Sequence, residues 1–274
     1  MTFLEHLEEL RWVLMRSAIA VVVCMIAVFI WIQDVFEKFI MGPASPDFIT
    51  YRALCALGRK LGLGDQLCVQ GMSFHIQSNT MQMEFTMSFS IAITLGFIIA
   101  SPFVIWQVWR FVAPGLKEKE RNAVRGTVFF VVLLFLLGTA FAYFVVAPMS
   151  IQFFATYSLS SSIEKRPTLD SYVSILNSFL LWTGLAFELP VVMYFLSRIG
   201  IVGPGFLRTY RKHAFVAILV VAAIITPPDV VSQILVSLPL LALYEVSILL
   251  AARSERQRIR AESAPPVKGS RNTA

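Results

Sequence analysis

Charge is what this chain has least of. Only 15% of its 274 residues are Asp, Glu, Lys or Arg, whereas hydrophobic residues make up 57%. The mean hydropathy is +0.72. A water-soluble domain needs more polar surface than this, so the composition excludes a soluble fold and predicts an all-α polytopic membrane protein.

Residues typical of enzyme and metal sites are also scarce. The three histidines, His6, His75 and His213, lie far apart with no ligand spacing, and no serine or cysteine has a recognisable nucleophile context. The glycines of segment 200–205 do not precede a Lys-Ser/Thr pair, as a phosphate loop requires. We therefore predict no catalytic residue, no metal site, no cofactor and no nucleic-acid partner.

Long apolar runs are abundant, and runs of this length and composition are typical of transmembrane helices. We predict six spans, at about residues 12–32, 86–111, 126–148, 173–197, 213–226 and 230–250. The first run has no small-residue cleavage site after it, so we expect it to remain in the membrane as a helix and not to act as a cleavable signal peptide.

Six spans place both termini on one side of the membrane, and the positive charges predict which side. Seventeen of the 23 Lys and Arg residues fall in the segments on the side of the termini. Cytoplasmic segments of membrane proteins carry an excess of Lys and Arg. Both termini are therefore predicted to be cytoplasmic.

Prolines inside the spans predict kinked helices and a cupped shape. Pro102, Pro190 and Pro239 lack an amide hydrogen and should each bend a helix. Pro227 and Pro228 should end the fifth helix, which makes the fifth and sixth helices short. Fourteen residues span about 21 Å, less than the hydrocarbon thickness of about 30 Å, which predicts local thinning of the bilayer.

The segments outside the spans are predicted as a long extracytoplasmic loop, residues 42–85, and a disordered cytoplasmic tail, residues 254–274. The tail is charged and poor in large apolar residues. The loop contains Cys55 and Cys68, and an extracytoplasmic compartment is oxidising, so we expect a disulfide between them. Cys24 is expected to be a packing residue in the first helix.

Acidic residues gather at the predicted cytoplasmic side. Glu9 lies in His6-Leu-Glu-Glu-Leu-Arg11, on the helix face opposite the apolar stripe of Leu7 and Leu14. A second group includes Glu120. Such acids can receive a cationic ligand, or the charges can simply pair within a helix, Glu8 with Arg11, Glu118 with Arg121 and Glu120 with Lys117.

Three polar residues are predicted within or beside the membrane. Glu188 lies near the midplane, where an ionised side chain costs about 2.5–3.5 kcal/mol, so it is either functional or a protonated, hydrogen-bonded carboxyl between helices. Asp229 can cap the sixth helix, and Gln233 can bond across helices. Glu245 is expected to pair with Arg253.

Six motifs occur in a fixed order along the chain. They are His6-Leu-Glu-Glu-Leu-Arg11, Gln107-Val-Trp-Arg-Phe111 with Val112-Ala-Pro114, Lys119-Glu120-Arg121, Ala140-Phe-Ala-Tyr143-Phe-Val-Val-Ala-Pro148, Phe187-Glu188-Leu-Pro190 and Thr226-Pro-Pro-Asp229-Val-Val-Ser-Gln233. Together they resemble the TatC family, the multi-spanning subunit of the twin-arginine protein translocase. The long first extracytoplasmic loop with its cysteine pair departs from the family pattern.

The resemblance implies a receptor in the bacterial inner membrane for folded precursors that carry twin-arginine signal peptides. Its site residues would be Glu9 and Glu120 as carboxylates for the arginine pair, with Arg11, Phe111 and Arg121 shaping the site, and Glu188, Gln233, Asp229 and Tyr143 as polar contacts inside the membrane. The partners implied are single-span TatA- and TatB-type subunits, further copies of the chain and the lipid bilayer, with transport driven by the proton gradient.

A proton-coupled secondary transporter that uses Glu188 is the alternative function. It predicts polar residues along a continuous path through several helices, whereas the acids of this chain concentrate at one surface. A passive scaffold, the third possibility, does not explain a carboxylate near the midplane. Binding of twin-Arg and twin-Lys peptides discriminates among the three.

The cysteine prediction can be tested directly on gels. Closing a loop of about fourteen residues contributes on the order of 3 kcal/mol. Without reductant, a mass-tagging alkylating agent should modify only Cys24, and after reduction it should modify all three cysteines. Equal mobility of the reduced and unreduced samples would contradict the disulfide.

Overall fold

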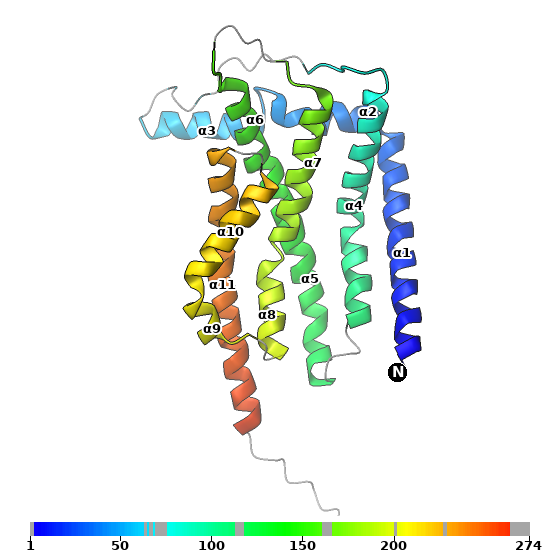
Figure 1. Cartoon of the computed structure of the whole chain (residues 1–274), viewed down its shortest axis with the longest axis vertical. Coiled ribbons are helices and arrows are strands. Elements are labelled where there is room, and N and C mark those ends of the chain that lie inside the picture. Colours follow the sequence, from blue (N-terminus) through cyan, green and yellow to red (C-terminus); the bar gives the residue numbers. More distant parts are fainter. Residues whose placement is uncertain are drawn as a thin grey trace, which may run out of the picture.

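A computed structural model describes residues 3–62, 65, 68, 76–112, 118–160, 166–199, 202–226 and 229–263. Within these ranges the chain is helical, and the sole β pairing is an isolated bridge between Gln77 and Thr168. The predicted all-α fold class is confirmed. We call the end of the bundle that carries the N-terminus the inner end and the opposite end the outer end (Figure 1).

Most of the long helices run side by side along one axis, and α10 is tilted against them (Figure 1). The helices of the bundle are α1 (Phe3–Ile30), α4 (Met83–Val112), α5 (Glu118–Phe141), α6 (Ala147–Thr156), α7 (Leu169–Ala186), α8 (Leu189–Ile199), α10 (Arg211–Ile225) and α11 (Val230–Ser263). The connecting elements are α2 (Ile32–Val35), η1 (Phe36–Ile40), η2 (Gly42–Ala44), α3 (Ile49–Lys60), η4 (Ala142–Val146) and α9 (Pro204–Thr209).

Five helical stretches of the described chain are long and apolar enough to cross a membrane. They are His6–Ile30, Met83–Phe111, Val128–Thr156, Leu169–Ser197 and Val230–Arg253. The fifth predicted helix is α10, whose 15 residues span about 22 Å. Its shortness agrees with the sequence, and the count of six full spans stays a prediction.

The sixth helix is not short, so that prediction is wrong. Helix α11 has 34 residues and continues to Ser263, beyond the predicted end at residue 250 and into the segment predicted to be disordered. The extra residues are mainly Ala, Arg, Glu and Gln, which favour a helix without being apolar. Residues 264–274 of the predicted tail lie outside the described residues.

Two irregular turns interrupt the middle of the bundle. The chain leaves helical geometry between α7 and α8 at Phe187 and Glu188, directly before Pro190, where a kink was predicted. The π-helical turn η4 joins α5 to α6, so this rod extends past the predicted boundary at residue 148 to Thr156. Pro102 and Pro239 lie inside unbroken helices, and Pro227 and Pro228 lie outside the described residues.

Helices α2, η1, η2 and α3 cross the outer end of the bundle (Figure 1). The predicted loop 42–85 is thus partly helical, because α3 fills twelve of its residues. A disulfide joins Cys55, on α3, to Cys68, which is the pairing expected from the sequence.

Three tyrosines attach this outer segment to the bundle. The hydroxyl of Tyr143 donates to the carbonyl of Phe39 at 2.8 Å, and that of Tyr172 donates to Ile40 at 2.6 Å. The hydroxyl of Tyr51 lies 2.7 Å from the carbonyl oxygen of Pro148. The bonds to Phe39 and Ile40 pair carbonyls at the end of η1, where the regular helix stops, as an apolar environment requires.

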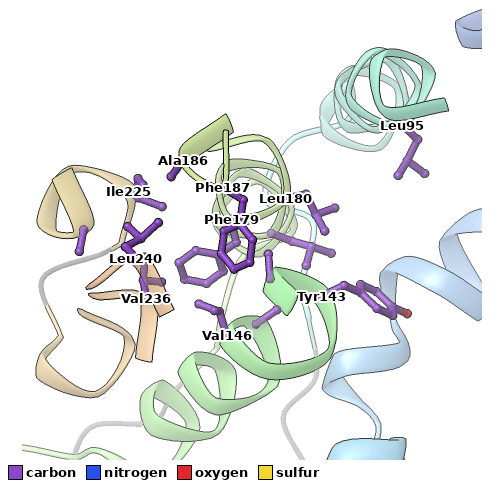
Figure 2. Close-up of a cluster of buried hydrophobic side chains, with 14 of the residues drawn as sticks. Leu95, Tyr143, Val146, Phe179, Leu180, Ala186, Phe187, Ile225, Val236 and Leu240 are labelled. Carbon is purple, nitrogen blue, oxygen red and sulfur yellow. The ribbon is translucent and has the colours of Figure 1, made fainter. Parts of the chain in front are cut away.

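The core lies between η4, α6, α7 and α11. Figure 2 shows part of it: Phe179 and Leu180 of α7, Phe187 directly after α7, Val146 of η4, and Val236 and Leu240 of α11 lie together, with Tyr143 of η4 at the edge of the group. Glycine permits the close approach of α5 and α7, because a Cβ at Gly138 would lie 2.7 Å from Phe187 and one at Gly184 would lie 2.7 Å from the Thr139 hydroxyl. Small residues at such interfaces are typical of membrane helix bundles.

Helix α1 packs on α4 through another glycine. A Cβ at Gly96 would lie 2.8 Å from the backbone of Met25, so Gly96→Ala should force the two helices apart. We expect a loss of about 1–3 kcal/mol of stability, measured as a lower unfolding temperature of the detergent-solubilised protein. Gly205→Ala is the control, because nothing lies within 4 Å of its new Cβ. Equal stability of both variants would contradict the packing of α1.

Candidate functional site

The second to fourth turns of α1 and the last turns of α4 enclose an open pocket at the inner end. Its volume is about 380 Å³. The lining residues are Glu8, Glu9, Trp12, Val13, Arg16, Gln107 and Arg110. We call it the Glu9 pocket.

The orientation of α1 explains how Glu9 comes to face α4. Val13 and Ser17 follow Glu9 at intervals of four residues on one helix face, and both are buried. The predicted apolar stripe faces away from the protein, since Leu7 and Leu14 are 45% and 61% exposed. The Glu9 side chain is half-buried on the face that meets α4.

Gln107 is the deepest polar residue of the pocket. Only 3% of its surface is exposed, and its Oε1 has no hydrogen-bond partner among the described residues. A buried acceptor left unpaired costs about 1–3 kcal/mol. Gln107 thus offers an acceptor to a ligand that brings a donor into the pocket.

Aromatic and basic side chains complete this end of the bundle. The ring of His6 stacks on Phe111 with 4.4 Å between centroids, which joins the start of α1 to the end of α4. The Arg16 guanidinium carbon lies 5.8 Å from the Trp12 ring centroid. The pocket therefore combines two acids, two arginines, an unpaired amide oxygen and one aromatic wall.

The structure brings some of the predicted binding residues together here. Glu9 lines the pocket, whereas Phe111, which follows Arg110 and stacks on His6, and the exposed Arg11 do not line it. Glu120 and Arg121 belong to the first turn of α5, and their side chains lie outside the described residues. The starts of α1 and α5 lie at the same end of the bundle (Figure 1), as the predicted site requires.

Glu188 lies at the break between α7 and α8, in the middle of the bundle (Figure 1). Its carboxyl group lies against the backbone of α5 at Phe135. Both carboxyl oxygens are buried without a hydrogen-bond partner of normal geometry among the described residues. Neither the functional nor the hydrogen-bonded alternative is decided by this placement, and the role of Glu188 stays a prediction.

Asp229 and Gln233 lie at the outer start of α11. The Asp229 Oδ1 accepts from the Ser232 amide at 2.6 Å, so this buried carboxylate caps the helix. The Gln233 side-chain amide donates to the Leu219 carbonyl of α10 at 3.2 Å, across the helix pair. Ser232 also contacts Ser150 of α6 by a hydroxyl hydrogen bond. The structure therefore contains the helix cap expected for Asp229 and the bond across helices expected for Gln233.

Tyr143 and Glu245 have partners that the sequence did not indicate. The Tyr143 hydroxyl donates its hydrogen to the carbonyl of Phe39 in the outer segment. Glu245 forms an ion pair with Arg211 of α10 at 2.7 Å, so its expected pairing with Arg253 is wrong. Sequence spacing identifies pairs within one helix, whereas Arg211 belongs to another.

One cluster among the described residues has metal-ligand types. Cys55, Asp65 and Cys68 lie close together. The two sulfur atoms are joined to each other in the disulfide, so they cannot act as thiolate ligands.

The fold and these polar clusters define a multi-pass membrane protein that gathers its polar residues at one end and at the breaks of its helices. The family model for TatC, the Sec-independent protein translocase protein, matches residues 5–239. The chain belongs to the TatC family. It is thus a multi-pass subunit of the Tat protein translocase, which takes part in protein transport and is not an enzyme.

Relatives and solved structures agree with this family. The chain is 38% identical to TatC of Helicobacter pylori strain J99 over 90% of this chain and 87% of the relative. It is 34% identical to TatCy of Bacillus subtilis strain 168 over 96% and 94%. A crystal structure of the twin-arginine translocase receptor TatC superposes with a TM-score of 0.70 and 32% identity, covering 92% of this chain and all of that one.

The Asp229 cap generates a stability prediction. Asp229→Ala removes the acceptor for the Ser232 amide and should cost about 0.5–2 kcal/mol, measured as a lower unfolding temperature in detergent. Asp229→Asn keeps a cap oxygen and should remain close to the wild type. If Asn were as destabilising as Ala, the negative charge and not the cap would be the property that α11 needs.

Proposed function

We propose that the Glu9 pocket binds the arginine pair of twin-arginine signal peptides, on the cytoplasmic face of the bacterial inner membrane. In this role the chain is the receptor subunit of the translocase for folded precursor proteins. The observation that carries the proposal is the pairing of a half-buried carboxylate, Glu9, with the unpaired Oε1 of Gln107 in one open pocket.

The chemistry of the pocket favours arginine over lysine. A guanidinium presents five N–H donors in a planar fork and can bind two acceptors at once, whereas an ammonium is a point charge. Glu8, Glu9 and Gln107 supply acceptors at different depths. One arginine fork can reach the Glu9 carboxylate and the Gln107 oxygen together, which satisfies the buried amide.

The second arginine of the peptide needs a second carboxylate. Glu120, in the first turn of α5, is our candidate, because this turn lies at the inner end with Glu9 (Figure 1). Arg16 and Arg110 line the same pocket and compete with the peptide for the acids. A ligand with two adjacent forks outcompetes them, since hydrogen bonds to charged groups contribute about 1.5–3 kcal/mol each.

Partner subunits belong to the same proposal. The proposed partners are single-span TatA- and TatB-type proteins and further copies of this chain, and the proton gradient drives export. Glu188 is the proposed polar contact inside the membrane, because an unpaired buried carboxyl gains most from a new hydrogen-bond donor. Gln233 and Asp229 already use one polar atom each within the chain.

The short α10 gives a physical reason for easier passage of cargo. Its 15 residues cover about 22 Å against about 30 Å of hydrocarbon, so the bilayer beside it is thinned. The long α11 limits this thinning to the side of α10, in contrast to the two short helices expected from the sequence.

Peptide binding to the detergent-purified chain tests the receptor proposal. A twin-Arg signal peptide should bind, and its twin-Lys counterpart should bind at least tenfold more weakly. Glu9→Gln and Gln107→Leu should each lower the affinity for the twin-Arg peptide about tenfold, measured by fluorescence anisotropy. Glu84→Gln is the control, because Glu84 is an exposed acid at the outer start of α4.

The proposal fails if both peptides bind equally well or if Glu9→Gln binds like the control. Loss of binding by Gln107→Leu alone would place the peptide deeper in the bundle and away from the carboxylate. Unchanged unfolding temperatures of the variants separate a lost contact from a lost fold.

A further inference from the structure

A second pocket near the inner end lies between α10 and α11, away from the Glu9 pocket. Its volume is about 490 Å³. The lining residues are Arg211, Lys212, Phe215, Val216, Leu241, Tyr244 and Glu245. The charged members come from the inner part of both helices, and the apolar members lie further toward the outer end. The pocket is thus amphiphilic along its length.

The charged part has a positive excess. The Arg211 Nη2 and Glu245 Oε2 atoms form an ion pair at 2.7 Å, with both side chains about half exposed. The guanidinium has further N–H donors beyond this pair. Lys212 is exposed and forms no ion pair with the described residues, and Arg208 lies in the last turn of the adjoining α9. Two cations and one acid therefore line the pocket, with a third cation on the adjoining helix.

The start of α10 adds to the positive potential. Its first turn contains Arg211, Lys212 and His213, with no acidic residue and no side-chain cap. The N-terminal end of a helix carries a partial positive charge, so cations there are unfavourable unless an anion is near. This turn is therefore positively charged, whereas a negative charge is what stabilises the start of a helix.

The apolar part of the pocket is open to the surroundings of the bundle. Phe215 and Val216 are 46% and 58% exposed, on a helix that belongs to a multi-pass membrane protein. Phe206 and Tyr210 are exposed beside the cations, with their rings 4.4 Å apart. Aromatic residues next to Lys and Arg are typical of the level of lipid headgroups.

We propose that this pocket is a binding site for one anionic phospholipid. Lys212 and the remaining donors of Arg211 bind the headgroup phosphate, and an acyl chain lies along Phe215, Val216 and Leu241. A free phosphate or an acidic peptide uses only the charged part, whereas a phospholipid satisfies both parts of the pocket. The lipid also supplies the negative charge that the start of α10 lacks.

Native mass spectrometry of the full-length chain in a zwitterionic detergent tests the proposal. Phosphatidylglycerol and phosphatidylcholine with identical acyl chains are the two probes. The wild type should retain phosphatidylglycerol about tenfold better than phosphatidylcholine. Lys212→Gln should lower the affinity for phosphatidylglycerol about fivefold, as expected for one cation at a membrane surface, and should lower that for phosphatidylcholine less, because the choline cation offsets the phosphate charge.

Two further variants control for general charge and for the apolar part. Arg52→Gln combined with Lys60→Gln removes two exposed cations from α3 at the outer end and should not alter lipid retention. Phe215→Ser should weaken both lipids, because it shortens the acyl-chain contact of either.

The position of the lipid is read from cross-linking. Phosphatidylglycerol with a photoreactive acyl chain should label peptides that contain residues 215–216 or 241. Equal retention of the two lipids by the wild type, an unchanged affinity of Lys212→Gln, or labelling confined to other helices would each overturn the proposal. Displacement of the lipid by glycerol phosphate alone would assign the pocket to a soluble phosphate instead.

Discussion

The structure depends on one constraint, that a backbone polar group in hydrocarbon must find its partner within the protein. Regular helices meet it along their length, and the interruptions are where other groups must help. At the start of α11 the help comes from Asp229, which binds the Ser232 amide. Between α7 and α8 the chain turns at Glu188, whose oxygens stay unpaired among the described residues. Breaks and buried polar side chains therefore coincide in this bundle.

Five of the predicted spans coincide with helical stretches of the described chain that are long and apolar enough to cross a membrane, because hydrocarbon selects for apolar length, which is a property of the sequence itself. The sequence-based predictions were wrong for segments that are helical without being apolar. The end of α11 is polar yet helical, since Ala, Arg, Glu and Gln favour helices. Helix α3 lies inside the predicted loop. Its polar residues outweigh the apolar Ile49, Tyr51 and Leu57, so its composition does not distinguish it from a loop.

The candidate site was predictable in part. Glu9 was identified from its place opposite an apolar stripe, and the structure puts it on the buried side of α1. Gln107 belongs to one of the motifs, but the sequence predicts no role for it. Only the packing of α1 on α4 reveals that its oxygen is buried without a partner among the described residues. The Arg211–Glu245 pair joins residues 34 positions apart, which no helical spacing rule indicates.

The three tyrosine hydroxyls at the outer end have a mechanical consequence. Tyr143 of η4 and Tyr172 of α7 bind residues 39 and 40 of the outer segment. The Tyr51 hydroxyl of α3 lies within hydrogen-bond distance of Pro43 of the same segment and of Pro148 of α6. Helices that are held together at one end can be displaced most at the other end. Any rearrangement of α5 and α7 that keeps these bonds must therefore displace their inner parts more than their outer ends.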